Sequence, residues 1–168
     1  IRSGAGDAIS GEQDSGDVTS GNTITNSGTI FSDDQRAINF FSDASTTTVT
    51  NNSSGHIYNS NTNETIKLDT SSTLTNSGKI ENKNSADNNS VLLIGDNNTV
   101  TLKNSGLVIG TIGASSGTSG NKLKIQHGIG QSYYYKTSGD FDLEDLDGNQ
   151  IVNGLSLIHI SEPTRRTP

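Results

Sequence analysis

Residues 23–30 read T-I-T-N-S-G-T-I, and three further segments of the chain repeat this pattern. The shared order is an apolar residue, a polar residue, Asn, Ser, Gly, any residue and an apolar residue. The other copies are residues 48–57, 73–80 and 101–108, and the glycines Gly28, Gly55, Gly78 and Gly106 are 27, 23 and 28 residues apart. A repeat of this length is the signature of a solenoid.

A second short apolar segment lies between the copies. It comprises residues 37–40, 65–68, 91–94 and 122–125, and residues 6–9 fit the same segment of an earlier repeat. Most of these runs alternate polar and apolar residues, which is typical of half-buried strands, whereas residues 91–94 are continuously apolar and fit a strand buried on both faces. Helical spacing is absent, and Asn, Thr, Ser and Gly are poor helix formers.

These strands are too short to bury their own apolar sides, so they must stack on copies of themselves. We therefore predict an all-β fold, a right-handed single-stranded parallel β-helix (β-solenoid), over residues 1–130. A narrow solenoid interior also explains how a chain with only 28% hydrophobic residues can fold.

The N-S-G segments are predicted to form the corners between strands. Asn and Gly tolerate positive φ, so this triplet suits a sharp turn. If the corners stack, their asparagines lie above one another, and their side-chain amides can form a hydrogen-bonded ladder. The alternative is that these residues serve turn formation alone. The predicted positions are Asn26, Asn52, Asn76 and Asn104, with Gly28, Gly55, Gly78 and Gly106.

Composition restricts the class of protein. Eighteen acidic against 11 basic residues give a net charge of -7, which argues against a nucleic-acid partner. The chain has no Cys, so it has neither disulfides nor thiolate metal ligands. Ser, Thr, Asn and Gly make up close to half of it, which disfavours an ordinary enzyme core. A disordered low-complexity linker is the alternative, but the apolar alternation argues against it.

The C-terminal part of the chain and its first residue differ from the repeats. Residues 110–120 read as a loop, and residues 131–154 as a cap or junction in which two strands, 141–146 and 149–152, flank the Asp147-Gly148 turn. Residues 155–168 resemble the translated read-through of a sequencing adapter, so we expect a non-native tail. The alternative is a genuine basic tail with a strand at 157–160. Since the chain starts without Met, we expect a fragment.

The N-S-G-T-I corner at residues 26–30 and the ending at residues 130–149 resemble passenger domains of bacterial autotransporters (type V secretion). The resemblance implies an extracellular, cell-surface protein, anchored in the outer membrane by its own C-terminal translocator barrel, which this chain lacks. It implies a structural stalk without enzymatic activity or cofactor, and adhesion to surface glycans or proteins is a further hypothesis. The alternative is a polysaccharide-acting β-helix enzyme, a lyase or glycosidase.

The densest acidic cluster is a weak candidate for Ca²⁺ binding, because hard oxygen ligands suit this cation. An EF-hand register fails, since Leu143 takes the place of the first aspartate, and alternating strand residues point to opposite faces. We therefore predict a solvated hairpin and no metal site. The cluster consists of Asp140, Asp142, Glu144, Asp145 and Asp147.

Candidate catalytic groups are few. Asp33, Asp34 and Arg36 follow the first corner, and a glycosidase needs two carboxylates roughly 5–10 Å apart, but adjacent residues diverge. His56 and His127 lack partners at metal-ligand spacing, and His56 is expected to be exposed. We predict no catalytic residues.

Overall fold

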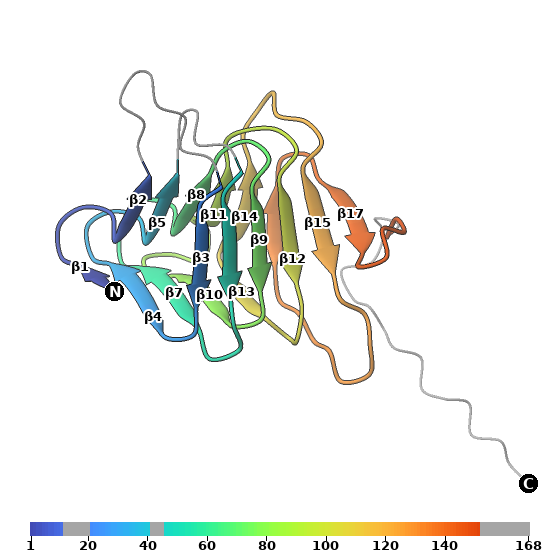
Figure 1. The fold of residues 1–168 in the computed structure, drawn as a ribbon, viewed down its shortest axis with the longest axis horizontal. Helices are drawn as coiled ribbons and strands as arrows, with labels where there is room; N and C mark the ends of the chain where they lie inside the picture. The colour runs from blue at the N-terminus through green and yellow to red at the C-terminus, as the bar shows by residue number, and fades with distance from the viewer. Residues whose placement is uncertain (12–20, 41–45, 152–168) are drawn as a thin grey trace, which may run out of the picture.

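The computed structural model describes residues 1–11, 21–40 and 46–151, and this part of the chain consists of strands and connections without a helix. The chain runs through three parallel sheets in turn and then begins the next coil (Figure 1). The prediction of an all-β parallel β-helix is confirmed.

Each complete coil contributes one strand to each sheet. Sheet A contains β1 (Arg2–Ser3), β4 (Thr29–Ser32), β7 (His56–Asn59), β10 (Lys79–Asn82) and β13 (Leu107–Ile109). Sheet B contains β2 (Ile9–Gly11), β5 (Ile38–Phe40), β8 (Ile66–Leu68), β11 (Asn89–Leu93), β14 (Thr111–Ala114) and β16 (Lys136–Ser138). Sheet C contains β3 (Thr23–Asn26), β6 (Thr48–Asn51), β9 (Thr73–Asn76), β12 (Thr99–Leu102), β15 (Lys122–Ile125) and β17 (Asp142–Asp145).

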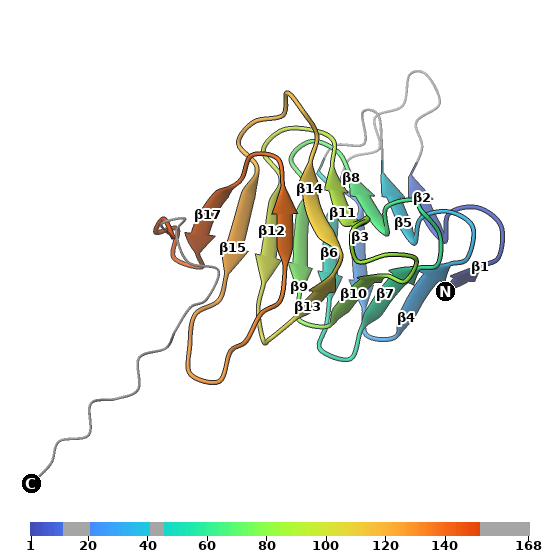
Figure 2. The ribbon, with the colours of Figure 1, turned by 180° about the vertical axis from the view of Figure 1, so that it is seen from behind.

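The four repeat copies are the corners between sheet C and sheet A. In each copy the strand before the corner belongs to sheet C and the strand after it to sheet A. Equivalent strands pair in parallel and in register, so Ile24, Val49 and Leu74 align in successive coils. The reverse view shows the same stacking from the other side (Figure 2).

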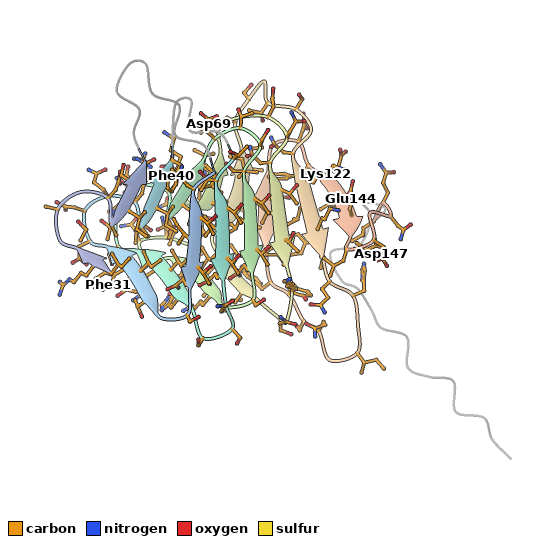
Figure 3. All side chains as sticks on the ribbon, viewed as in Figure 1. Phe31, Phe40, Asp69, Lys122, Glu144 and Asp147 are labelled. Carbon is orange, nitrogen blue, oxygen red and sulfur yellow. The ribbon has the colours of Figure 1, made fainter. Side chains whose placement is uncertain are left out.

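The core is a narrow column of aliphatic side chains that alternate with outward-facing residues. Sheet A buries Ile30, Ile57, Ile80 and Val108; sheet B buries Ile38, Ile66, Val91 and Ile112; sheet C buries Val49, Leu74, Val100 and Leu123. The ring of Phe40 occupies the space that a side chain at position 11 would need, so Gly11 is required there (Figure 3). Burial is repeated coil by coil, which is how a small hydrophobic fraction suffices.

Two predicted segments differ from the structure. Residues 122–125 were predicted as the second apolar segment of the last repeat, but β15 lies in sheet C, in register with Thr99–Leu102. The strand of this coil that is equivalent to the second apolar segment is β14, Thr111–Ala114, which was predicted as part of a loop. Its Ile112 lies in the core, and Gly113 leaves room for the side chains of Asn89 and Ser138. The strand was missed because the Gly/Thr-rich composition of these residues is more typical of a loop.

The predicted junction adds a further strand to each of two sheets. β16 pairs with β14, and β17 pairs with β15, both in parallel. After β17 the chain turns at Gly148, whose φ is 88°, and Gln150 forms an antiparallel bridge with Glu144. The hairpin-like arrangement is therefore present, with its second strand reduced to one bridge. The tail predicted at 155–168 lies outside the described residues.

Candidate functional site

A ladder of side-chain amides connects successive coils at the corner between sheets C and A. Asn26, Asn51 and Asn76 end β3, β6 and β9 in register, and all three are buried. Asn26 Nδ2 donates to Asn51 Oδ1 at 2.9 Å, and Asn51 Nδ2 donates to Asn76 Oδ1 at 2.8 Å. Because buried amides are costly without partners, each coil depends on the next.

The ladder predicted from the sequence was wrong in two of its four members. Asn52 lies one residue beyond the ladder on the surface, where its Nδ2 donates to Ser27 Oγ at 2.7 Å. Asn104 is also exposed and donates to Ser77 Oγ at 3.1 Å, because Leu102 occupies the ladder position of that coil. The cause is strand alternation: Asn51, two residues after the inward-facing Val49, faces inward as well, and Asn52 faces outward.

Three of the four corner glycines are required by the close approach of neighbouring coils; positive φ is not the reason, since none of the four adopts it. A Cβ on Gly55 would lie 2.8 Å from the carbonyl oxygen of Asn26, and one on Gly78 would lie 2.9 Å from Nδ2 of Asn51. Gly106 is confined in the same way by the backbone of Asn76, whereas Gly28 has open space around it. The stacked coils therefore leave no room for a side chain at three of the four positions.

A second ladder, absent from our predictions, precedes sheet C. Ser72 N donates to Asn98 Oδ1 at 2.8 Å, and Asn98 N donates to Asn121 Oδ1 at 3.0 Å. Thr47 N donates in turn to Ser72 Oγ at 3.3 Å. All four side chains are buried. The sequence signal is a polar residue immediately before each of the strands β6, β9, β12 and β15.

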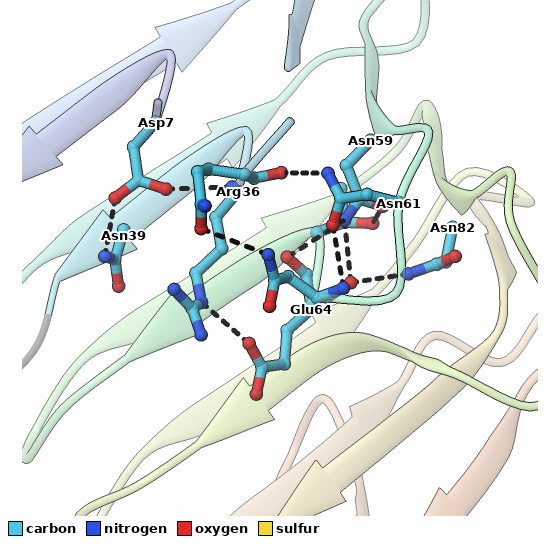
Figure 4. Close-up of polar contacts among 10 residues, drawn as sticks. Asp7, Arg36, Asn39, Asn59, Asn61, Glu64 and Asn82 are labelled. Carbon is cyan, nitrogen blue, oxygen red and sulfur yellow. Dashed lines mark hydrogen bonds and ion pairs between the residues drawn. The ribbon is translucent and has the colours of Figure 1, made fainter. Parts of the chain in front are cut away.

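A third polar cluster occupies the corner between sheets A and B (Figure 4). Asn59 and Asn82 end β7 and β10, and the Nδ2 of each donates to the carbonyl oxygen of Asn63 at 2.7 Å. Thr65 Oγ1 donates to Asn59 Oδ1 at 2.7 Å. All three corners of the solenoid thus carry buried polar side chains that bond between coils or to the local turn.

Charged side chains from three coils meet beside this cluster. Asp7 accepts hydrogen bonds from Arg36 N at 2.8 Å and from Asn39 Nδ2 at 2.7 Å, and Arg36 Nε donates to Glu64 Oε2 at 2.7 Å (Figure 4). Oδ1 of Asn39, a residue only 4% exposed, has no hydrogen-bond partner among the described residues. Asp33, which follows the first corner with Arg36, pairs with Arg2 at 3.0 Å.

The outer face of sheet A carries aromatic rings stacked between coils. Phe31 and Tyr58 are parallel within 8°, with their centroids 4.8 Å apart, and His56 lies 4.7 Å from Tyr58. Lys83 Nζ lies 3.5 Å from the Tyr58 centroid, and the guanidinium of Arg2 lies over Phe31. Cations therefore cover ring faces at both ends of the stack.

His56 is half-buried, contrary to the expected exposed position. Its Nε2 lies 3.1 Å from Glu81 Oε2, and Lys79 Nζ lies 2.7 Å from the same oxygen. Burial lowers the pKa of His56, and the nearby Lys79 and Lys83 lower it further against the opposing effect of Glu81. Burial opposes ionisation of Glu81, but the hydrogen bond and charge of Lys79 outweigh it and lower the pKa of that carboxyl.

Two acidic residues of the junction, Glu144 and Asp145, are engaged with neighbouring side chains. Glu144 pairs with Lys122 at 2.6 Å and with Lys124 at 3.3 Å (Figure 3), and hydrogen bonding to Lys122 lowers its pKa. Asp145 accepts hydrogen bonds from the backbone and side chain of Asn149, which lower the pKa of its carboxyl. Among residues 1–11, 21–40 and 46–151, no group of three His, Cys, Asp or Glu side chains is placed to hold a metal ion.

Comparison with protein-family models, characterised proteins and solved structures finds no match for this chain. Within the described part of the chain, no helix has the length and apolar character to cross a membrane.

Proposed function

We propose that this chain is a rigid stalk segment of a secreted, surface-exposed bacterial protein of the autotransporter type. The observation that supports a stalk is the side-chain hydrogen bonding between coils, represented by the Asn26, Asn51 and Asn76 ladder. In a solenoid, stability is the sum of the coils and their nearest-neighbour contacts. Hydrogen bonds between side-chain amides in a water-poor interior strengthen the contacts between those coils that carry them.

Composition supports the same proposal. A passenger that crosses the envelope unfolded gains from having no Cys, because disulfides would hinder translocation, and a net charge of -7 favours solubility outside the cell. In this proposal the partner is the chain's own C-terminal translocator barrel. Adhesion to surface glycans or proteins is a further function of the complete passenger.

The autotransporter assignment is tested by a long sequencing read of the source DNA across the codon of Gly154. The expected continuation encodes about a dozen strands of roughly ten residues, alternating in hydrophobicity and flanked by aromatic residues. A frame that stops, or continues into more coils, would contradict the assignment. At the protein level, protease added to intact cells that express the complete gene should cleave the stalk and leave a cytoplasmic marker protein intact.

The alternative of a polysaccharide-acting enzyme draws on the meeting of Asp7, Arg36 and Glu64 from three coils. Each of these groups is bonded to a neighbouring coil, so the stalk accounts for them as coil-joining contacts. Incubation with a panel of acidic and neutral polysaccharides tests the alternative. We expect no release of reducing or unsaturated ends. Release that the Glu64→Gln variant abolishes would establish the enzyme instead.

A further inference from the structure

The outer face of sheet C carries threonine at two outward positions on each of four successive strands. The register aligns these residues between coils without a shift. One rank is Thr23, Thr48, Thr73 and Thr99, and the other is Thr25, Thr50, Thr75 and Thr101. We call these eight residues the threonine face; its strands β3, β6, β9 and β12 lie side by side in both views (Figures 1 and 2).

The threonine face is a regular two-dimensional grid. Neighbouring strands of a sheet are about 4.7–4.9 Å apart, and residues two apart on a strand are separated by about 6.6–6.8 Å. Each grid point presents one hydroxyl and one methyl group. All eight side chains are at least partly exposed.

The grid is held rigidly from behind. The residue between the two threonines of each strand points into the core, and Val49, Leu74 and Val100 are at most 1% exposed. Three of the four strands end in the Asn26, Asn51 and Asn76 ladder. A ligand therefore meets an array whose spacing is already fixed, which lowers the entropic cost of binding.

The hydroxyl groups of the threonine face are available to a ligand. Within the described part of the chain, none of the eight hydroxyls forms a hydrogen bond to another protein group. In contrast, the Thr65 hydroxyl donates to the carbonyl oxygen of Glu81 in the next coil, and that of Ser72 accepts from Thr47 N in the preceding coil. Their position on a solvent-facing sheet leaves water as their partner.

The chemistry of the threonine face selects among possible partners. The grid contains no charge and no aromatic ring; charge begins only one coil later, at Lys122 and Lys124. A sugar ring would be stacked on aromatic side chains, and a protein partner would be anchored by Trp, Tyr or Arg. The partner that fits is neutral, rigid and periodic, with hydrogen-bonding groups at spacings comparable to those of the grid. Ordered water at the surface of ice has these properties.

We propose that the threonine face binds ice. The methyl groups order the adjoining water, and the hydroxyls complete its hydrogen bonds, so the protein adsorbs through many weak contacts made at once. This inference concerns sheet C alone and goes beyond the stalk, so its failure would leave the proposed function untouched.

The test is partition of the 168-residue chain into slowly growing ice, together with the shape of single ice crystals grown in its presence. Thr50→Lys/Thr75→Lys places bulky charges at the centre of one rank. Thr29→Lys is the matched control, because Thr29 is an exposed residue of a parallel strand in sheet A. We expect the original chain and the control to enter ice and shape the crystals. We expect the double variant to be excluded like a non-binding protein of similar size.

Thr50→Ser/Thr75→Ser covers the case in which the lysine variant does not fold, as judged by far-UV circular dichroism. It keeps both hydroxyls, removes both methyls and leaves the core intact, and we expect it to enter ice less than the original chain. Exclusion of the original chain from ice would overturn the proposal. So would an equal loss in the Thr29→Lys control, or unchanged incorporation of the folded double variants.

Discussion

Asn51 and Asn76 occupy the same register position in adjacent coils, and Asn51 Nδ2 donates to Asn76 Oδ1 at 2.8 Å. Both side chains are fully buried, so neither amide can turn to water for a partner. The hydrogen-bonding capacity of one coil is therefore completed by the next. The arrangement couples the stability of neighbouring coils through side chains as well as through the backbone.

Removal of the middle amide of the ladder, that of Asn51, should lower the stability of the fold. Asn51→Ala removes two ladder hydrogen bonds and leaves a small cavity, so we expect the free energy of unfolding to fall by about 2–4 kcal/mol. Asn52→Ala is the matched control, since its exposed amide bonds only Ser27 and should change stability by less than about 1 kcal/mol. Urea denaturation followed by circular dichroism measures both. Equal losses would show that the ladder does not run through Asn51.

A second pair of variants tests the close approach of the coils. Gly78→Ala inserts a methyl group against the backbone of Asn52 and Gly55, so we expect a loss of about 1–3 kcal/mol or failure to fold. Gly28→Ala meets nothing within 4 Å and should change stability by less than about 1 kcal/mol. Thermal unfolding of the two proteins compares them. If Gly28→Ala were the more damaging change, steric confinement would be the wrong explanation for the glycine at Gly78.

The repeat and its strands were predictable because solenoid sequence patterns are local. Apolar alternation in segments such as residues 73–80 identifies strands, and the recurring N-S-G triplet identifies corners. Residues 111–114 escaped prediction because Gly113 and Thr111 resemble a loop, and only pairing with β11 shows that Ile112 fills a core position.

The site residues were harder to predict because they depend on register between coils. Two extra residues in the second corner separate Asn51 from the corner glycine, Gly55, and only strand alternation distinguishes Asn51 from Asn52. The meeting of Asp7, Arg36 and Glu64 spans three coils and has no local pattern. The threonine face did have a signal, since Thr precedes and follows the apolar residue in T-I-T, T-V-T and T-L-T. The pattern could be interpreted as a surface only once the structure showed that both threonines of each strand face outward.

Calcium is expected to have no effect on stability. The carboxylate of Glu144 is paired with two lysines, and that of Asp145 is bonded by Asn149, so these groups would have to give up existing partners to bind an ion. We expect the Tm in excess Ca²⁺ and in excess chelator to agree within about 1 °C, since a ligand shifts Tm only by binding the folded state. A rise in Tm that depends on Ca²⁺ concentration and is lost in Asp145→Asn would establish a site there.

Stability should fall as the pH drops below the ordinary pKa of histidine, because of His56. Its pKa is lowered in the folded state by burial and by the neighbouring Lys79 and Lys83, with Glu81 opposing. The unfolded chain therefore binds more protons at this site, and the free energy of unfolding rises with pH across the interval between the two pKa values. This contribution is complete above the unfolded value of 6.5 and is lost as the pH falls through the folded value.

Urea denaturation at about pH 7.5 and about pH 5.5 tests this dependence in a range where the carboxyl of Glu81 stays ionised. We expect the original chain to lose more stability over this interval than His56→Gln, because the variant has no group to protonate at that position. The other two histidines are common to both proteins, so their contributions cancel in the comparison. An NMR titration gives the site-specific value, and a His56 pKa above that of the urea-unfolded chain would reverse the predicted sign. That outcome would mean that the Glu81 carboxylate, 3.1 Å away, dominates over burial and the two lysines.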